Sequence, residues 1–279
     1  MEIISEQRCH GGVQGFYQHA SVATAGTMKF GVFQPPRTAT GKAPVLYFLA
    51  GLTCNAETAA IKAGAQQLAA KLGLILVTPD TSPRDTGIEG ATGDWEFGEG
   101  AGFYLDATTP AFAQRFRMYQ YVTEELPALI GANFGADMGR ESICGHSMGG
   151  HGALTIALKN PARYKSVSAF APIVAPSLVP WGQKALPRFL GDDPASWRAY
   201  DACALIEDGA RFPGSILVDQ GDADQFLQNQ LKPALLQSAC STAGQALDLR
   251  VQTGYDHSYW FIQSFVDDHL RHHARALGG

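Results

Sequence analysis

The spacing of apolar residues divides the chain into two parts. Over residues 1–34 apolar and polar residues are mixed, and the runs 17–21 and 28–33 predict partly exposed strands. The apolar stretches 45–50 and 74–77 are instead continuous, which is typical of strands that are buried on both faces of a parallel sheet. The chain is therefore expected to begin with exposed β-structure and to continue into a buried parallel sheet.

Helical patterns separate the later strands. An alanine-rich helix is predicted over 57–72, where Gly73 ends it, and another over 112–131, with Pro127 near its end. Further strands are expected at 142–144, 166–170, 216–219 and 247–251, and further helices over 153–159, 229–240 and 258–276. Strands that alternate with helices form a mostly parallel sheet with helices on both faces. With its antiparallel β start, this order predicts an α/β-hydrolase fold, in a single domain over 1–279.

Three segments fit neither pattern. A turn-rich loop is expected over 38–42. Residues 80–111 form a long glycine-rich loop, and loops of this length in compact domains are usually functional. Residues 171–213 are rich in proline and contain Trp181 and Trp197. We expect them to form short helices and loops that act as a partial lid.

Composition and charge narrow the function. The chain is 46% hydrophobic and 17% charged, with a net charge of −5 and no basic run, so nucleic-acid and anionic-membrane partners are not expected. The sequence contains no run of 18 apolar residues, so no membrane span is predicted. Its five cysteines are scattered, without a C-x-x-C pair, so we expect free thiols, no bound zinc and a cytoplasmic location. The N-terminus lacks the features of a signal peptide.

One short stretch carries a catalytic motif. In residues 143–152 a β-forming run ends at Gly145, Ser147 follows, and a helical run begins after Gly149. This is the G-x-S-x-G nucleophile elbow, a strand, a sharp turn with serine, and a helix. Glycines allow strand and helix to approach closely around the serine. The N–H of Met148 then lies at a helix N-terminus, where an anion is favoured.

The elbow requires a base and an acid that come later in the chain. In α/β-hydrolases the order is serine, then aspartate or glutamate, then histidine, with both partners on loops after later strands. His257 follows the last predicted strand and precedes the last helix. It is therefore the candidate base.

The other histidines have simpler interpretations. They precede the serine, flank it or lie on the last helix: His10, His19, His146, His151, His269, His272 and His273. Those that flank the serine are assigned to packing or to the pocket lining, because sequence neighbours cannot easily face its hydroxyl. Of those on the last helix, His269 and His272 share a face and raise the alternative of a metal site. A favourable interaction with the helix C-terminus explains them more simply, so no metal is predicted.

Three carboxylates compete for the role of the acid. Asp219 still belongs to the predicted strand, whereas Asp222 and Asp224 lie in the loop that follows. Their D-x-D spacing raises the alternative of calcium, but residues 225–227 supply no further ligands. By position alone, Asp222 and Asp224 are equal candidates. Asp256 comes in the wrong order and is expected to cap the last helix.

Together these residues predict acyl transfer. Ser147 attacks a carbonyl, His257 accepts its proton and returns it to the leaving group, and the aspartate orients the imidazole. The oxyanion requires two N–H donors. Met148 supplies one, and the other is expected in the loop 51–54, after the strand 45–50.

Longer blocks resemble a known family, the S-formylglutathione hydrolases, also called esterase D. The similarity covers nearly the whole chain. Its most specific blocks are residues 51–54, 100–104, 145–154, 159–161, 166–172, 180–182, 219–221, 224–227 and 254–260. The resemblance implies hydrolysis of S-formylglutathione to glutathione and formate, in formaldehyde detoxification, without a cofactor. It also implies a homodimer.

The resemblance extends to individual residues. It implies that Asp224 is the catalytic acid and that the N–H groups of Leu52 and Met148 form the oxyanion hole. Cys54 matches a cysteine near the active site that makes members sensitive to thiol reagents, and Trp181 matches a tryptophan beside the pocket. Other readings are a general short-chain carboxylesterase without glutathione preference, and acyl transfer to an alcohol. A binding protein with this fold is disfavoured, because no member of the triad is missing.

Overall fold

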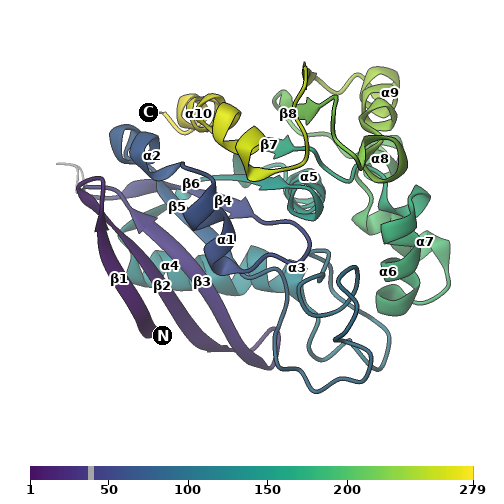
Figure 1. The fold of residues 1–279 in the computed structure, drawn as a ribbon, viewed down its shortest axis with the longest axis horizontal. Coiled ribbons are helices and arrows are strands. Elements are labelled where there is room, and N and C mark those ends of the chain that lie inside the picture. Colours follow the sequence, from purple (N-terminus) through teal and green to yellow (C-terminus); the bar gives the residue numbers. More distant parts are fainter. Residues whose placement is uncertain (37–40, 279) are drawn as a thin grey trace.

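The computed structural model describes residues 1–36 and 41–278, which include a nine-stranded sheet in the order β1-β2-β3-β5-β4-β6-β7-β8-β9 (Figure 1). The strands are β1 (Glu2–Cys9), β2 (Gly12–Ser21), β3 (Gly26–Gln34), β4 (Ala43–Leu49), β5 (Ile75–Pro79), β6 (Ala136–His146), β7 (Tyr164–Phe170), β8 (Ile216–Gly221) and β9 (Leu247–Gln252). The pairs β1–β2, β2–β3 and β3–β5 are antiparallel. The pairs from β5–β4 to β8–β9 are all parallel. The predicted sheet is confirmed; most of the loop predicted over 38–42 lies outside the described residues.

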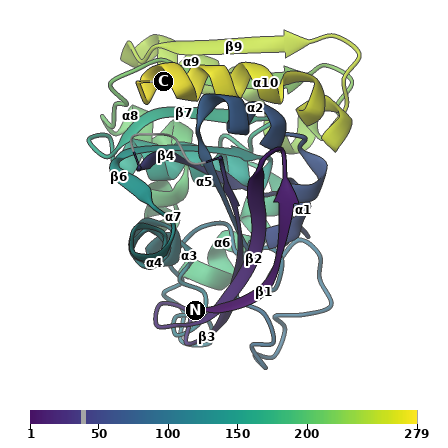
Figure 2. The same ribbon diagram turned by 90° about the vertical axis from the view of Figure 1, so that its left-hand side faces the viewer.

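Helices cover both faces of this sheet (Figure 2). They are α1 (Ala56–Lys62), α2 (Gln66–Leu72), α3 (Met118–Gln120), α4 (Leu126–Asn133), α5 (Met148–Lys159), α6 (Pro180–Leu190), α7 (Pro194–Trp197), α8 (Ala202–Glu207), α9 (Pro233–Ala243) and α10 (Tyr259–Ala276). The helices α1, α2 and α10 pack on one face, and α4 and α5 pack on the other. The predicted α/β-hydrolase fold is therefore confirmed. In the described residues, no helix has the length and apolar character needed to cross a membrane.

The prediction of one helix over 57–72 is wrong, because the structure has two helices there, α1 and α2. Gly64 adopts a left-handed φ of +71° between α1 and α2. The side-chain amide of Gln66 donates to the carbonyl of Ala60 across this break. A left-handed residue interrupts the helical hydrogen-bond ladder, and glycine adopts that conformation without steric cost. The alanine-rich composition hid the break.

The helix predicted over 112–131 begins later than expected. Residues 107–117 form turns and bends, because Phe112 and Phe116 pack into an aromatic cluster with Phe97 and Phe189. Helical structure starts at α3 and passes through a π-helical segment, Tyr121–Glu125, into α4. Tertiary packing of the aromatic side chains therefore overrides the local helical pattern.

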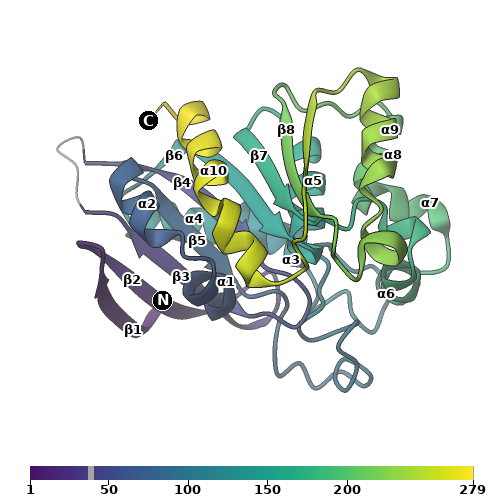
Figure 3. The ribbon, with the colours of Figure 1, turned by 45° about the horizontal axis from the view of Figure 1, so that its top comes forward.

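Loops gather at one end of the molecule, where the long loop after β5 lies next to α6 and α7 (Figure 3). The amides of Thr108 and Thr109 both donate to the carbonyl of Phe189, at 2.8 and 3.0 Å. The loops that follow β4, β5 and β6 leave the same edge of the sheet, because these strands are parallel. In open α/β sheets that edge is where ligands bind.

Candidate active site

Ser147 lies at the turn between β6 and α5, with φ 58° and ψ −119°. This conformation is rare for a residue with a side chain. The turn is held because the Ser147 amide donates to the carbonyl of Phe170 at 2.9 Å. A Cβ on Gly145 would lie 2.2 Å from the Gly149 carbonyl oxygen, and one on Gly149 would lie 2.1 Å from the Leu49 carbonyl oxygen. Only glycine fits at either position, as the elbow motif predicts.

The loop after β4 lies directly beside the serine. A Cβ on Gly51 would be 3.1 Å from the Cβ of Ser147, so the two backbones are in contact. The amide of Cys54 donates to the carbonyl of Gly51 at 3.3 Å, which closes a turn around half-buried Leu52. Met148 is the first residue of α5, where amides have no partner within the helix. The structure thus brings together the two segments in which an oxyanion site is expected.

His257 and Asp224 are joined by a hydrogen bond of 2.5 Å between Nδ1 and Oδ2. The carboxylate is 5% exposed, and its other oxygen accepts from the amide of Phe226 at 2.8 Å. An aspartate in this position fixes the tautomer of the ring and stabilises its protonated form. Within the described residues, no hydrogen bond joins the Ser147 hydroxyl to His257.

The competing carboxylates are used elsewhere. Asp222 accepts the amide of Gly254 at 2.6 Å and so ties the loop that carries His257 to the loop that carries Asp224. Asp256 was expected to cap the last helix, but the cap is Ser258, whose hydroxyl accepts the amide of Trp260. The Asp256 carboxylate instead holds Ser258 through its amide, at 3.0 Å, and through its hydroxyl. The hydrogen-bonding geometry therefore singles out one aspartate at the imidazole.

Asp219, on β8, belongs to a separate buried network between the sheet and α10. Its carboxylate accepts from His269 Nε2 at 3.0 Å and pairs with Arg250. Burial alone would raise the pKa of Asp219, but the hydrogen bonds from His269 and Arg250 outweigh it and lower this pKa to about 2. His269 and His273 both contact the hydroxyl of Ser168, at 2.8 and 2.7 Å. Among the described residues, no group of three or more His, Cys, Asp or Glu is arranged to hold a metal.

His146, the residue before Ser147, packs against His257. The ring of His146 lies 4.5 Å from that of His257, centroid to centroid, and 5.7 Å from that of Tyr259. Burial, together with the nearby His257, holds the pKa of His146 well below its usual range. A neutral ring of this kind adds no positive charge beside the base. The sequence had assigned His146 and His151 to packing or lining, and His151 packs in α5 with Nε2 3.0 Å from the carbonyl of Phe103.

An aromatic wall extends from His257 to Trp181. The ring of Phe226 lies 5.0 Å from that of His257, and Trp181 lies 4.8 Å from Phe226. The indole N–H of Trp181 donates to Glu96 Oε1 at 2.9 Å, and Lys184 Nζ contacts the other oxygen of Glu96 at 2.7 Å. The long loop after β5 therefore fixes the orientation of Trp181.

The sequence analysis did not identify Phe226 or Glu96 as site residues. Phe226 stands two positions after Asp224. Its place beside the candidate acid was the signal in the sequence that could have identified it. Glu96 lies in a glycine-rich loop without any pattern that marks it. Only the fold brings it to α6.

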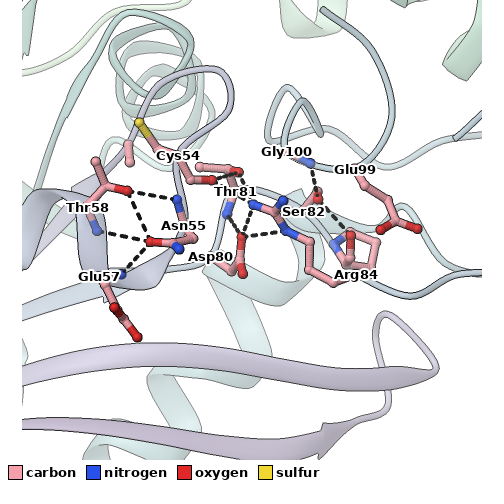
Figure 4. Close-up of polar contacts among 12 residues, drawn as sticks. Cys54, Asn55, Glu57, Thr58, Asp80, Thr81, Ser82, Arg84, Glu99 and Gly100 are labelled. Carbon is pink, nitrogen blue, oxygen red and sulfur yellow. Dashed lines mark hydrogen bonds and ion pairs between the residues drawn. The ribbon is translucent and has the colours of Figure 1, made fainter. Parts of the chain in front are cut away.

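Cys54 borders a polar network at the end of β5 (Figure 4). Its carbonyl accepts hydrogen bonds from Thr81 Oγ1 and from Arg84 Nη2, both at 2.7 Å. Burial raises the pKa of the Cys54 thiol, which disfavours the reactive thiolate at neutral pH. The side chain is therefore a neighbour of the candidate oxyanion loop and has no base of its own.

The chain was compared with known proteins. A family model described as "Putative esterase" matches residues 21–272. The S-formylglutathione hydrolase of Mus musculus is 51% identical over 275 residues, 98% of each chain, and that of Paracoccus denitrificans is 50% identical over 277 residues, 99% of this chain and 98% of the other. The solved structure of an S-formylglutathione hydrolase from Agrobacterium tumefaciens is 52% identical, covers 99% of this chain and 100% of its own, and superposes with a TM-score of 0.97.

A more distant solved structure, a ferulic acid esterase, is 19% identical with a TM-score of 0.73 and shows the shared fold alone. The matches at about half identity extend over nearly the full length of both partners. They show that the chain is a hydrolase of the esterase family and belongs, within it, to the S-formylglutathione hydrolases.

Proposed function

We propose that this chain hydrolyses S-formylglutathione to glutathione and formate, with Ser147 as nucleophile, His257 as base and Asp224 as the acid that orients it. The observation that carries the proposal is the hydrogen bond between His257 and Asp224 at the elbow of Ser147. The choice of substrate rests on relatives at about half identity that are named S-formylglutathione hydrolases.

The reaction has two halves. Ser147 Oγ attacks the formyl carbonyl while His257 takes its proton, and the N–H groups of Leu52 and Met148 donate to the oxyanion. His257 then protonates the leaving thiolate of glutathione, and a formyl-serine remains. Water attacks this ester with His257 again as base, and formate leaves. The reaction requires no cofactor.

A direct comparison of substrates tests this function. We expect kcat/KM for S-formylglutathione to exceed that for p-nitrophenyl acetate by orders of magnitude, because the glutathione part supplies binding energy that the small ester lacks. Equal values would instead favour a general short-chain carboxylesterase. Product analysis with an added alcohol separates hydrolysis from acyl transfer.

We also propose that the chain is a single domain over 1–279 that works as a cytoplasmic homodimer. Free thiols at all five cysteines support a reducing compartment, and the dimer is carried over from the family. Light scattering should give twice the mass of one chain, and unfolding in urea should give one cooperative transition. A monomeric mass would contradict the homodimer, and two separate transitions would contradict the single domain.

A further inference from the structure

A cleft lies beside the loop that carries Leu52, on the side of the antiparallel strands. This cleft has a volume of about 600 Å³, within the range of small-molecule sites. Its lining includes Lys29 from β3, Arg115, Asp80 after β5, Glu57 on α1 and the ring of Phe16. We refer to it as the β3 cleft. Nothing in the proposed reaction uses these residues.

Its deepest charged group is a buried carboxylate with one free oxygen. Asp80 is 4% exposed. Oδ1 accepts from the amide of Thr81 at 2.7 Å and from Arg84 Nε and Nη2, at 3.1 and 2.7 Å. Within residues 1–36 and 41–278, no hydrogen bond reaches Oδ2. In Figure 4 the dashed lines meet one Asp80 oxygen while the other points away from them. Oδ2 is not among the polar atoms that are fully buried without a partner, so it opens onto the cleft and can accept a hydrogen bond from a ligand.

The opposite charge comes from the strand side of the cleft. In the part of the chain that the structure describes, neither Lys29 nor Arg115 makes a side-chain hydrogen bond or ion pair, and Arg115 Nε is buried without a partner. The guanidinium of Arg115 is seated against Gly26, where a Cβ would lie 2.5 Å from Nη2. Guanidinium groups bind carboxylates through two parallel hydrogen bonds. The strand side therefore offers a carboxylate site.

The two walls require both charges in a single ligand. An anion alone would use only Arg115 and Lys29 and leave Asp80 Oδ2 to water, and a cation alone would leave the buried Arg115 Nε without an acceptor. We propose that the β3 cleft binds a small zwitterion of the amino-acid or short-peptide class. Its ammonium group donates to Asp80 with Glu57 nearby, and its carboxylate accepts from Arg115 and Lys29. The site goes beyond the proposed function, and its occupancy can be measured without hydrolysis.

The cleft is mechanically joined to the candidate oxyanion loop. Arg84, which pairs with Asp80, also donates to the carbonyl of Cys54, and Cys54 closes the turn that carries Leu52. An ammonium group at Oδ2 shares the Asp80 carboxylate with Arg84, which holds Oδ1, and its positive charge weakens that ion pair. Occupancy should therefore be transmitted to the loop 51–54 and alter catalysis.

Calorimetry with defined probes tests the site. L-Glutamate and γ-glutamylglycine carry both charges, succinate lacks the ammonium group and putrescine lacks the carboxylates. We expect saturable binding of the first two, and binding weaker by about tenfold or more for the others, because each of the others lacks one set of charged hydrogen bonds. Absence of binding by both zwitterions, or equal binding of succinate, overturns the proposal.

Variants locate the binding. Arg115→Gln should raise the dissociation constant of L-glutamate about tenfold, and Lys29→Gln should raise it less. Arg117→Gln is the matched control, since Arg117 is exposed in the same segment and does not line the cleft. An unchanged dissociation constant in the Arg115 variant overturns the assignment. Because Lys29 is exposed, Lys29→Gln is expected to fold normally and keeps the test valid if the Arg115 variant unfolds.

Kinetics test the connection to the loop. Saturating L-glutamate should change kcat for p-nitrophenyl acetate, and Arg115→Gln should remove that change while Arg117→Gln keeps it. An unaltered kcat in the presence of bound L-glutamate overturns the coupling. Binding itself is read separately by calorimetry, so failure of the hydrolase proposal remains distinguishable from failure of the cleft.

Discussion

At the scale of single residues, the site depends on a backbone conformation and on one hydrogen bond. Ser147 holds a φ of 58°, which side chains rarely adopt, and the close contacts at Gly145 and Gly149 make that turn sterically specific. The imidazole of His257 is oriented by Asp224. A small chemical change at either place should therefore have a large kinetic effect with little effect on the fold.

Asp224→Asn tests the orientation of the base. The amide can donate to Nδ1 and so favours the wrong tautomer of His257, and we expect kcat to fall by about 10⁴. Asp222→Asn is the matched control, because this neighbouring carboxylate contacts a backbone amide and not the ring. Steady-state kinetics with S-formylglutathione measures both. Similar losses in the two variants would contradict the assignment.

Cys54→Ser tests the origin of thiol sensitivity. Burial raises the pKa of Cys54 above its ordinary value of 9.0, so its alkylation should accelerate as pH rises towards and beyond 9. The serine variant should keep most of its activity and resist iodoacetamide, because the thiol lies beside the candidate oxyanion loop and Ser147 is the proposed nucleophile. Cys9→Ser, a half-buried position on β1, should remain sensitive. Complete inactivity of Cys54→Ser would refute this view of the thiol.

At the scale of elements, α10 connects the site to the core of the sheet. Its N-cap, Ser258, directly follows His257. About three and four turns further along, His269 and His273 contact the hydroxyl of Ser168 on β7. Side chains four residues apart share one face of a helix. His269, which sequence analysis weighed together with His272 as a metal ligand, therefore helps His273 to dock this helix.

Ser168→Ala tests this docking. The change leaves a nitrogen of His269 and one of His273 without their partner, and each buried unsatisfied group costs roughly 1–3 kcal/mol. We expect the free energy of unfolding in urea to fall by about 2 kcal/mol or more. Ser264→Ala on the exposed face of the same helix, where the hydroxyl donates to the carbonyl of Trp260, should change it by less than about 0.5 kcal/mol. Equal effects would show that the network does not stabilise the helix.

At the scale of the whole molecule, one sheet positions both the candidate active site and the β3 cleft. Loops after β4, β5 and β6 meet at the carboxyl edge of the parallel strands, and the antiparallel strand β3 borders the cleft. The same packing buries His146, His151, His269 and His273, and burial lowers the pKa of each. Stability of the whole fold should therefore depend on pH.

The sign of this dependence follows from His151, whose pKa falls from 6.5 to about 4. The unfolded chain binds a proton below pH 6.5 while the folded chain does not, so stability is full above 6.5 and decreases as pH falls towards 4. The loss from this one group is on the order of 3 kcal/mol. In urea unfolding measured between pH 7 and 4, His151→Gln should reduce the decrease of the free energy of unfolding with falling pH. His10→Gln, at an exposed position, should leave that decrease unchanged. A pH-independent stability would contradict the burial argument.

Local pattern was sufficient for the features that depend on neighbouring residues. The continuous apolar run 45–50 predicted β4 because a strand buried on both faces needs apolar side chains on both. Ser147 between two glycines predicted the elbow, since strand, turn and helix are adjacent in sequence. His257 followed from its place after the last strand. Failures occurred where a distant contact overrides local preference, as at Phe112 and Phe116, whose aromatic packing delays the helix.

The sequence by itself determined the class of fold, the elbow of Ser147 and the candidate base, because these depend on periodicity and chain order. Position alone left Asp222 and Asp224 equal, and the family resemblance favoured Asp224. Only the tertiary structure put one of them on the imidazole of His257, brought Glu96 to Trp181 and formed the β3 cleft. These are contacts between residues far apart in sequence, and distance in space between such residues is decided by the packing of whole elements.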